Sequence, residues 1–315
     1  MIHRLRWMIM LVGITLMGAA CGAARAPVPA APERLRVLVT TQQIGDAVQN
    51  VAGEQVELVM LLGPGIDPHT YIPTESDLRK FEQADVIFAN GLHLEAQMDR
   101  VLAQLATREG KTVVQLGDQL DSTNLLSWEP EAGLPYDPHV WNDVRLWKEV
   151  VAAIATTLAE VDPSNAATYQ ANATTYAAEL DALHAYLLAQ ADTIPAEQRI
   201  LVTAHDAFGY FGRAYGFEVE AVQGLSTEAE ASAADIQELA QIIIAGNVPA
   251  IFIETTISPR TIEAVQAAVQ DATGKPLLLG GELYSDAMGA PGSGTDTYIG
   301  MMRHNIDTIV AALGA

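Results

Sequence analysis

Short apolar runs alternate with amphipathic stretches along the chain from about Leu35 onward. In the first half, β-rich runs at 36–40, 56–62, 84–89 and 111–116 alternate with helix-like stretches near 44–52, 75–83 and 94–107. In the second half, β-rich runs at 199–204, 217–222, 250–254 and 276–279 alternate with helix-like stretches near 207–215, 233–245, 259–272 and 297–313. Because strands joined by crossover helices form parallel sheets, this order predicts an α/β fold. We predict two lobes, each with a mostly parallel sheet flanked by helices.

One long helix is predicted between the lobes. Asp162-Pro163 is typical of a helix start, and neither glycine nor proline occurs from Ser164 through Ile194. A single apolar stripe runs along this stretch, formed by Tyr169, Ala173, Tyr176, Leu180, Leu183 and Leu187. About 30 helical residues would extend roughly 45 Å, which is longer than a crossover within one lobe requires. The pattern predicts a first lobe at 35–161, a rigid linking helix at 162–194 and a second lobe at 195–315. A rigid helix implies that the lobes move little relative to each other. The alternative is that the linking stretch forms two helices of a bundle with a break between them.

The N-terminal segment has the features of an export signal. Arg4 and Arg6 precede an almost wholly apolar run that is too short to span a bilayer, so residues 1–20 are predicted to be a signal peptide. Small residues then lead to Cys21, a pattern that resembles a bacterial lipobox, although Gly18 stands where leucine is usual. We predict lipidation of Cys21, with an ordinary cleavage site as the alternative. Residues 21–34 are rich in alanine and proline and are predicted to be a flexible tether.

Composition excludes several classes of partner and site. The 315 residues include 17 Lys and Arg against 39 Asp and Glu, a net charge of −22. A chain this acidic is not suited to binding nucleic acid or anionic lipid, which both need clustered basic residues. The single cysteine excludes an intramolecular disulfide and any site built from several cysteines. A cationic partner remains open.

Two histidines occur in nearly the same sequence setting. His69 and His139 both follow an Asp-Pro pair, and an aromatic residue stands two positions later, Tyr71 and Trp141 respectively. Proline restricts its own backbone and that of the preceding aspartate, so each histidine is predicted to lie on a stiff loop. A histidine held in this way suits a metal ligand, whose geometry tolerates little movement. The alternative is a pair of Asp-Pro turns with incidental histidines.

Two further candidates follow strands of the second lobe. His205 ends one β-rich run and Asp286 comes just after another. Ligands of open α/β sheets bind at the carboxyl ends of the strands. Each residue could equally be a helix cap or a surface residue when taken alone.

Several motifs together give the chain a family resemblance, from about Leu35 to the C-terminus. They are Gly65-Ile-Asp-Pro-His-Thr-Tyr71, Asn90-Gly-Leu-His-Leu-Glu95, Asp137-Pro-His-Val-Trp141, Thr203-Ala-His-Asp-Ala-Phe-Gly-Tyr-Phe211, Gly280-Gly-Glu-Leu-Tyr-Ser-Asp286 and Asn305-Ile-Asp-Thr-Ile309. In this order they closely resemble the zinc/manganese-binding solute-binding proteins of bacterial metal ABC importers, the cluster A-I or TroA-like family. The resemblance implies a metal between the lobes, bound by His69, His139, His205 and Asp286. It also implies a rigid linking helix and docking on a membrane permease that a cytoplasmic ATPase drives.

The resemblance limits the expected metal to zinc or manganese but does not decide between them. Three imidazoles and a carboxylate suit Zn²⁺, and a bidentate carboxylate also accommodates Mn²⁺. Family members committed to manganese tend to carry Glu where this chain has His205, which favours zinc. Many zinc members carry a histidine-rich loop in the first lobe, and none occurs between His93 and His139, which weakens a zinc-only assignment.

The remaining histidines and the alternative functions complete the expectations. His93 is expected to be part of the loop structure or to support a metal ligand, His184 to be a surface residue and His304 to be structural; His3 falls in the signal peptide. We predict a monomeric metal receptor outside the cytoplasm, held to the membrane through Cys21 only or free in the periplasm, rather than an enzyme. A surface adhesin is the alternative, and a zinc hydrolase is disfavoured because four protein ligands leave little room for a reactive water and no His-Glu-x-x-His pattern occurs.

Overall fold

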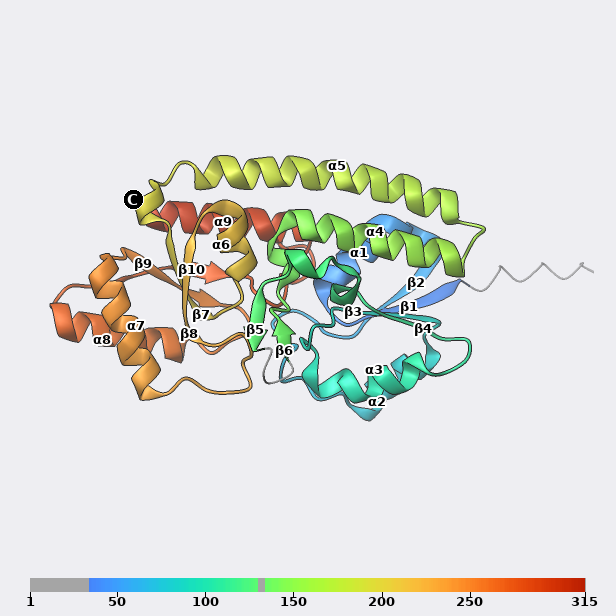
Figure 1. Ribbon diagram of the computed structural model, residues 1–315, viewed down its shortest axis with the longest axis horizontal. Helices are drawn as coiled ribbons and strands as arrows, with labels where there is room; N and C mark the ends of the chain where they lie inside the picture. The colour runs from blue at the N-terminus through green and yellow to red at the C-terminus, as the bar shows by residue number, and fades with distance from the viewer. Residues whose placement is uncertain (1–33, 130–133, 315) are drawn as a thin grey trace, which may run out of the picture. The chain divides into compact units, whose positions relative to one another are not determined.

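Four parallel strands form the sheet of the first lobe, as the sequence pattern predicts. The computed structural model describes residues 34–129 and 134–314. The strand order is β2 (Val56–Met60), β1 (Leu35–Val39), β3 (Val86–Ala89) and β4 (Thr112–Gln115). The central strands β1 and β3 are buried because helices cover both faces of the sheet (Figure 1).

Among the described residues, the α-helices of this lobe are α1 (Gln42–Ala52), α2 (Glu75–Gln83), α3 (Asp99–Ala106) and α4 (Val144–Val161). The helix expected near 94–107 begins only at α3, after a short 3-10 turn. The residues before that turn, Gly91, Leu92 and His93, have positive φ angles that an α-helix does not allow. α4 is absent from the predicted elements, although its buried apolar residues recur at helical spacing.

A short antiparallel hairpin, β5 (Ser127–Glu129) and β6 (Leu134–Tyr136), is also absent from the predicted elements. Each strand has only three residues, too few for a clear alternation of apolar and polar side chains. The hairpin leads directly into the second Asp-Pro-His motif, and the amide of Asp137 donates to the carbonyl of Leu126 at 3.0 Å. It therefore fixes the chain just before His139.

The second lobe contains four strands in two parallel pairs. β7 (Ile200–His205) pairs with β8 (Glu218–Gln223), and β9 (Ala250–Glu254) pairs with β10 (Leu278–Leu283). β7 and β9 lie side by side, so the carboxyl ends of the two pairs meet at one edge (Figure 1). The helices of this lobe are α6 (Gly209–Tyr215), α7 (Ala233–Gly246), α8 (Arg260–Thr273) and α9 (Tyr298–Leu313). The predicted α/β class, with two lobes of mostly parallel sheet, is confirmed.

A single helix, α5 (Ala166–Ala191), lies between the two lobes in sequence. All six residues of the predicted apolar stripe are buried, and at about 1.5 Å per residue its 26 residues extend about 39 Å. The helix begins at Ala166 rather than after Asp162, because Asp162 ends α4 and uses its carboxylate to accept hydrogen bonds from Asn165 and Tyr169. The alternative of two helices with a break is wrong.

α5 covers a hydrophobic core that the two lobes share. It packs against α1 and α4 of the first lobe and α9 of the second (Figure 1). The largest cluster of buried apolar side chains includes Val37 and Trp147 from the first lobe and Leu201, Phe252 and Met301 from the second. Opening the lobes on this side would expose apolar surface, which is consistent with the prediction of small lobe movements.

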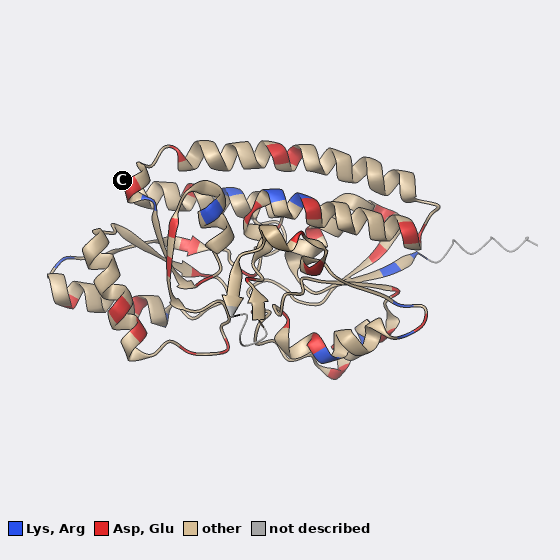
Figure 2. Cartoon of the chain, viewed as in Figure 1, with Lys and Arg blue, Asp and Glu red and all other residues tan. Residues whose placement is uncertain are grey.

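Acidic residues are distributed over both lobes rather than gathered at one place (Figure 2). The predicted signal peptide, Cys21 and nearly all of the predicted tether lie outside the described residues. Within residues 34–129 and 134–314, no helix has both the length and the apolar character that crossing a membrane requires.

Candidate metal centre

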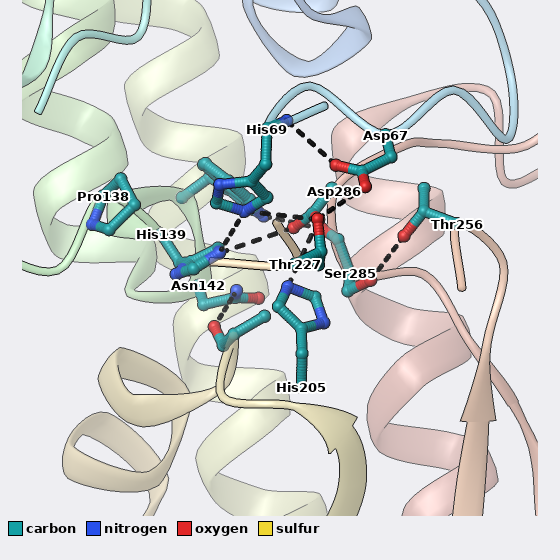
Figure 3. A network of polar contacts seen from close by, with 12 residues as sticks. Asp67, His69, Pro138, His139, Asn142, His205, Thr227, Thr256, Ser285 and Asp286 are labelled. Carbon is teal, nitrogen blue, oxygen red and sulfur yellow. Dashed lines mark hydrogen bonds and ion pairs between the residues drawn. The ribbon is translucent and has the colours of Figure 1, made fainter. Parts of the chain in front are cut away.

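Four side chains from four separate segments of the chain converge between the lobes. His69 follows β2, His139 follows β6, His205 is the last residue of β7 and Asp286 follows β10 (Figure 3). Each offers one nitrogen or oxygen atom, and these atoms all lie within 4.8 Å of one another. The residues are at most 2% exposed. The structure thus brings together all four residues that the sequence singled out.

The two Asp-Pro-His motifs form the same local turn. Asp67 Oδ1 accepts from the backbone N–H of His69 at 2.9 Å, and Asp137 Oδ1 accepts from that of His139 at 2.8 Å. Asp137 Oδ1 also lies 2.8 Å from His139 Nδ1, so this aspartate orients the imidazole ring as well as the loop. The aspartate, and not the proline alone, therefore fixes each histidine.

The aromatic residue of the second motif also contacts its histidine. The ring of Trp141 packs edge-on against His139, with ring centroids 5.3 Å apart. In the first motif, Tyr71 instead donates its hydroxyl hydrogen to Asp77 of α2 at 2.6 Å. Tyr71 thus anchors the far end of the His69 loop.

Glu254 supports His205 and was not singled out from the sequence. Its Oε2 lies 2.6 Å from His205 Nδ1, and its Oε1 accepts from the backbone N–H groups of Ala204 and His205 at 2.7 and 2.9 Å. Glu254 is 3% exposed and ends β9, directly beside the end of β7. The sequence feature that could have identified Glu254 is a charged residue at the end of an apolar strand, where the carboxyl ends of parallel strands meet.

The charges inside the cluster depend on Asp286. Its Oδ2 lies 3.2 Å from His205 Nε2 and 3.7 Å from His69 Nε2, and its Oδ1 lies 3.6 Å from His139 Nε2. Burial alone would raise the pKa of Asp286, but the facing histidines, His205 foremost, hold that pKa well below its usual range. Asp286 is therefore ionised at neutral pH.

The pKa values of His69 and His205 shift in opposite directions, although burial acts to lower both. Burial lowers the pKa of His69 to about 3, although Asp286 opposes the shift, so His69 is neutral. Burial would also lower the pKa of His205, but Glu254 and Asp286 outweigh it and raise that pKa well above its usual value. In the absence of another cation, His205 thus supplies the positive charge that Asp286 requires.

Buried polar atoms that lack a hydrogen bond show where a bound cation would fit. His205 Nε2 and both carboxylate oxygens of Asp286 have no hydrogen-bond partner among the described residues. The Nε2 atoms of His69 and His139 face each other at 3.3 Å. Three imidazole nitrogens and a carboxylate pointing at one volume form a donor set that zinc and manganese both accept.

His93, His184 and His304, the other histidines among the described residues, lie outside the cluster. His93 Nδ1 is 2.7 Å from Asp99 Oδ2, and His304 Nε2 is 3.0 Å from the carbonyl oxygen of Glu282. His184 is partly exposed on α5, as expected of a surface residue, and its Nδ1 lies 3.3 Å from the Tyr215 hydroxyl. These contacts show that the three histidines pack within loops and helices away from the cluster.

Comparison with known proteins agrees with this architecture. Residues 37–312 match the family described as zinc-uptake complex component A, periplasmic. Zinc-binding protein TroA of Treponema pallidum (strain Nichols) is 48% identical over 277 residues, which cover 88% of this chain and 88% of that protein. Manganese-binding lipoprotein MntA of Bacillus subtilis (strain 168) is 39% identical over 293 residues, 93% of this chain and 94% of that protein. The chain belongs to this family of periplasmic zinc-uptake components.

A solved structure shows the same fold. The periplasmic zinc-binding protein TroA from Treponema pallidum matches with a TM-score of 0.85 at 47% identity, covering 89% of this chain and 99% of that one. The family resemblance stated from the sequence motifs is therefore confirmed, and so is the two-lobe fold that it implied.

Replacing Glu254 should destabilise the metal-free protein. Glu254→Ala leaves the Nδ1–H of His205 and two backbone N–H groups without their acceptor in a buried place, so the free energy of unfolding should fall by about 3 kcal/mol. Glu254→Gln keeps one acceptor oxygen and should lose about half as much. Urea unfolding in the presence of a chelator measures both.

Glu238→Ala is the matched control, because Glu238 is exposed on α7 and should change the free energy of unfolding by less than about 0.5 kcal/mol. Equal, small losses for Glu254→Ala and Glu238→Ala would contradict the supporting role of Glu254.

Proposed function

We propose that this protein captures a divalent transition metal, Zn²⁺ or Mn²⁺, outside the cytoplasm and delivers it to the membrane permease of an ABC importer. The observation that carries the proposal is the buried cluster of His69, His139, His205 and Asp286, whose donor atoms lie within 4.8 Å of one another. Family membership supports the same role, since the matching family is named for zinc uptake.

In this proposal the three histidines bind the metal through Nε2 and Asp286 binds it through its carboxylate. A metal would replace the charge that His205 supplies, so Asp286 stays paired and His205 gives up its proton. Asp137 and Glu254 would orient the rings of His139 and His205. Four protein ligands fill a tetrahedral site, which suits capture of the ion and not activation of a water molecule.

The carboxylate geometry bears on which metal is taken. Both oxygens of Asp286 face the histidines, so the carboxylate can bind through one oxygen or through two. One oxygen gives the four-coordinate geometry usual for zinc, and two give a higher coordination number that manganese accepts. We propose zinc as the preferred ion, because three imidazoles favour it, with manganese as a second cargo.

Metal should stabilise the native protein, and His139→Ala should remove most of that effect. At a Zn²⁺ concentration 100 times the dissociation constant, binding adds about 2.7 kcal/mol to the free energy of unfolding. If loss of one ligand weakens binding 100-fold, the same concentration adds only about 0.4 kcal/mol. Thermal unfolding of chelator-treated protein, with and without added Zn²⁺, measures the difference.

His304→Ala is the control for that experiment, because His304 lies outside the cluster and contacts the carbonyl of Glu282, the hydroxyl of Thr308 and the ring of Tyr284. It should respond to Zn²⁺ like the natural protein. Full stabilisation of His139→Ala by Zn²⁺ would contradict the proposed ligand set.

Direct competition decides between the two metals. Chelator-treated protein is dialysed against equal concentrations of Zn²⁺ and Mn²⁺, and bound metal is measured by elemental analysis. We expect zinc to predominate, because its affinity for a given nitrogen and oxygen site generally exceeds that of manganese. Retention of manganese alone would overturn the preference for zinc.

Export and anchoring complete the proposal. Residues 1–20 would direct export, Cys21 would carry the lipid, and residues 21–34 would tether a monomer made of lobes 35–161 and 195–315 joined by the helix at 162–194. The apolar run before Cys21 supports this arrangement, and the related Bacillus protein is named a lipoprotein.

Cys21→Ser should release the protein from the membrane. Expressed in a bacterial host, the natural chain should enter the detergent phase on Triton X-114 partitioning, since acyl chains add hydrophobic surface that the exported chain otherwise lacks. Cys21→Ser should remain in the aqueous phase. A natural chain found wholly in the aqueous phase would show an ordinary cleavage site instead.

A further inference from the structure

Hydrogen bonds between the lobes connect three of the four loops of the cluster directly to one another. Trp141 Nε1, two residues after His139, donates to the carbonyl of Ser285, next to Asp286, at 2.9 Å. Asn142 Nδ2 donates to the carbonyl of Ala207, two residues after His205, at 2.8 Å. Both bonds are buried and both end on a backbone carbonyl, so the loops of His139, His205 and Asp286 are fixed relative to each other.

The loop of His69 is attached differently. Within the described residues, its hydrogen bond to the second lobe runs from the Thr227 hydroxyl to Asp67 Oδ2, at 2.6 Å. Thr227 lies in the half-exposed segment after β8, and the bond joins two side chains rather than a side chain and the backbone. Glu228 makes a second contact of this kind, accepting from Gln97 Nε2 at 2.7 Å on the exposed surface.

Asp67 transmits this contact to His69. The same carboxylate accepts from the backbone N–H of His69 through Oδ1, and from Thr70 Oγ1 through Oδ2 at 3.0 Å. Any displacement of Asp67 by Thr227 is therefore passed to the backbone of His69 through one hydrogen bond.

A cavity lies on the outer side of this contact. Its volume is about 550 Å³, and its lining includes Asp67, Thr227, Glu230 and Thr256. Thr256 Oγ1 lies 3.2 Å from the hydroxyl of Ser285, beside Asp286 (Figure 3). The cavity thus reaches the wall of the cluster beside the Thr227–Asp67 contact.

We propose that Thr227 is a positioning residue for the metal site: through Asp67 it holds the His69 loop against the second lobe and sets the rate at which a bound ion leaves. The inference rests on the proposed function, because it assigns His69 to the ion. When the Thr227–Asp67 bond opens, His69 can withdraw toward its own lobe while the other three ligands stay together. The ion then leaves through the cavity on that side.

The test is the release of Zn²⁺ from the zinc-loaded protein into excess EDTA, measured by stopped-flow. Thr227→Val keeps the size of the side chain and removes its hydroxyl, so release should accelerate about tenfold, as expected for losing a hydrogen bond to a charged group. Thr227→Ala, which introduces no additional methyl group, should show the same acceleration. Thr227→Ser restores the hydroxyl and should release zinc within about twofold of the natural rate.

Thr70→Val is the matched control, because it removes a hydrogen bond to the same oxygen of Asp67 without crossing between the lobes. Its release rate should stay within about threefold of the natural one. Equal acceleration in Thr70→Val and Thr227→Val, or none in Thr227→Val, would overturn the positioning role. Failure of the natural protein to retain zinc would instead overturn the proposed function itself.

Discussion

The electrostatic balance between Asp286 and the imidazoles that face it is the constraint on which the rest of the structure depends. An ionised carboxylate that is 2% exposed is costly unless positive charge compensates it. No lysine or arginine forms an ion pair with Asp286 in residues 34–129 and 134–314, and His205 carries the compensating charge instead. A proton can be exchanged for a metal ion, whereas a fixed basic side chain would compete with it permanently. The cluster is therefore stable without metal and still able to accept one.

The fold meets this constraint by holding residues far apart in sequence at one point. Parallel strands bring their carboxyl ends to one edge, so β2, β7 and β10 each deliver a loop to the same volume. The carboxylates of Asp137 and Glu254 then orient two of the rings. The shared core beneath α5 keeps the two edges opposite each other. Local hydrogen bonds and the shared hydrophobic core thus together fix the positions of the four side chains of the cluster.

Much of this arrangement could be predicted from the sequence, and the physical reason differs for each part. The apolar residues of α5 recur at helical spacing, the strands are short apolar runs, and the Asp-Pro-His motif occurs twice. Local sequence patterns were therefore enough to predict these features. Glu254 and the Thr227–Asp67 bond could not be predicted, because each depends on which strand lies beside which or how two lobes meet. The start of α5 was placed too early because Asp162 ends α4 and its carboxylate accepts from Asn165 and Tyr169 instead of starting the helix. The two strands of the hairpin before His139 were too short to show an alternation of apolar and polar residues.

The core shared by the two lobes has a consequence for how the loaded protein is distinguished from the empty one. Separating the lobes would cost about 2.5 kcal/mol for each 100 Å² of apolar surface exposed to water. Binding energy is then not consumed in closing the molecule, which favours high affinity through preorganisation. By the same reasoning, we expect a loaded molecule to differ little in shape from an empty one. Release of the ion then requires movement of the His69 loop and not separation of the two lobes.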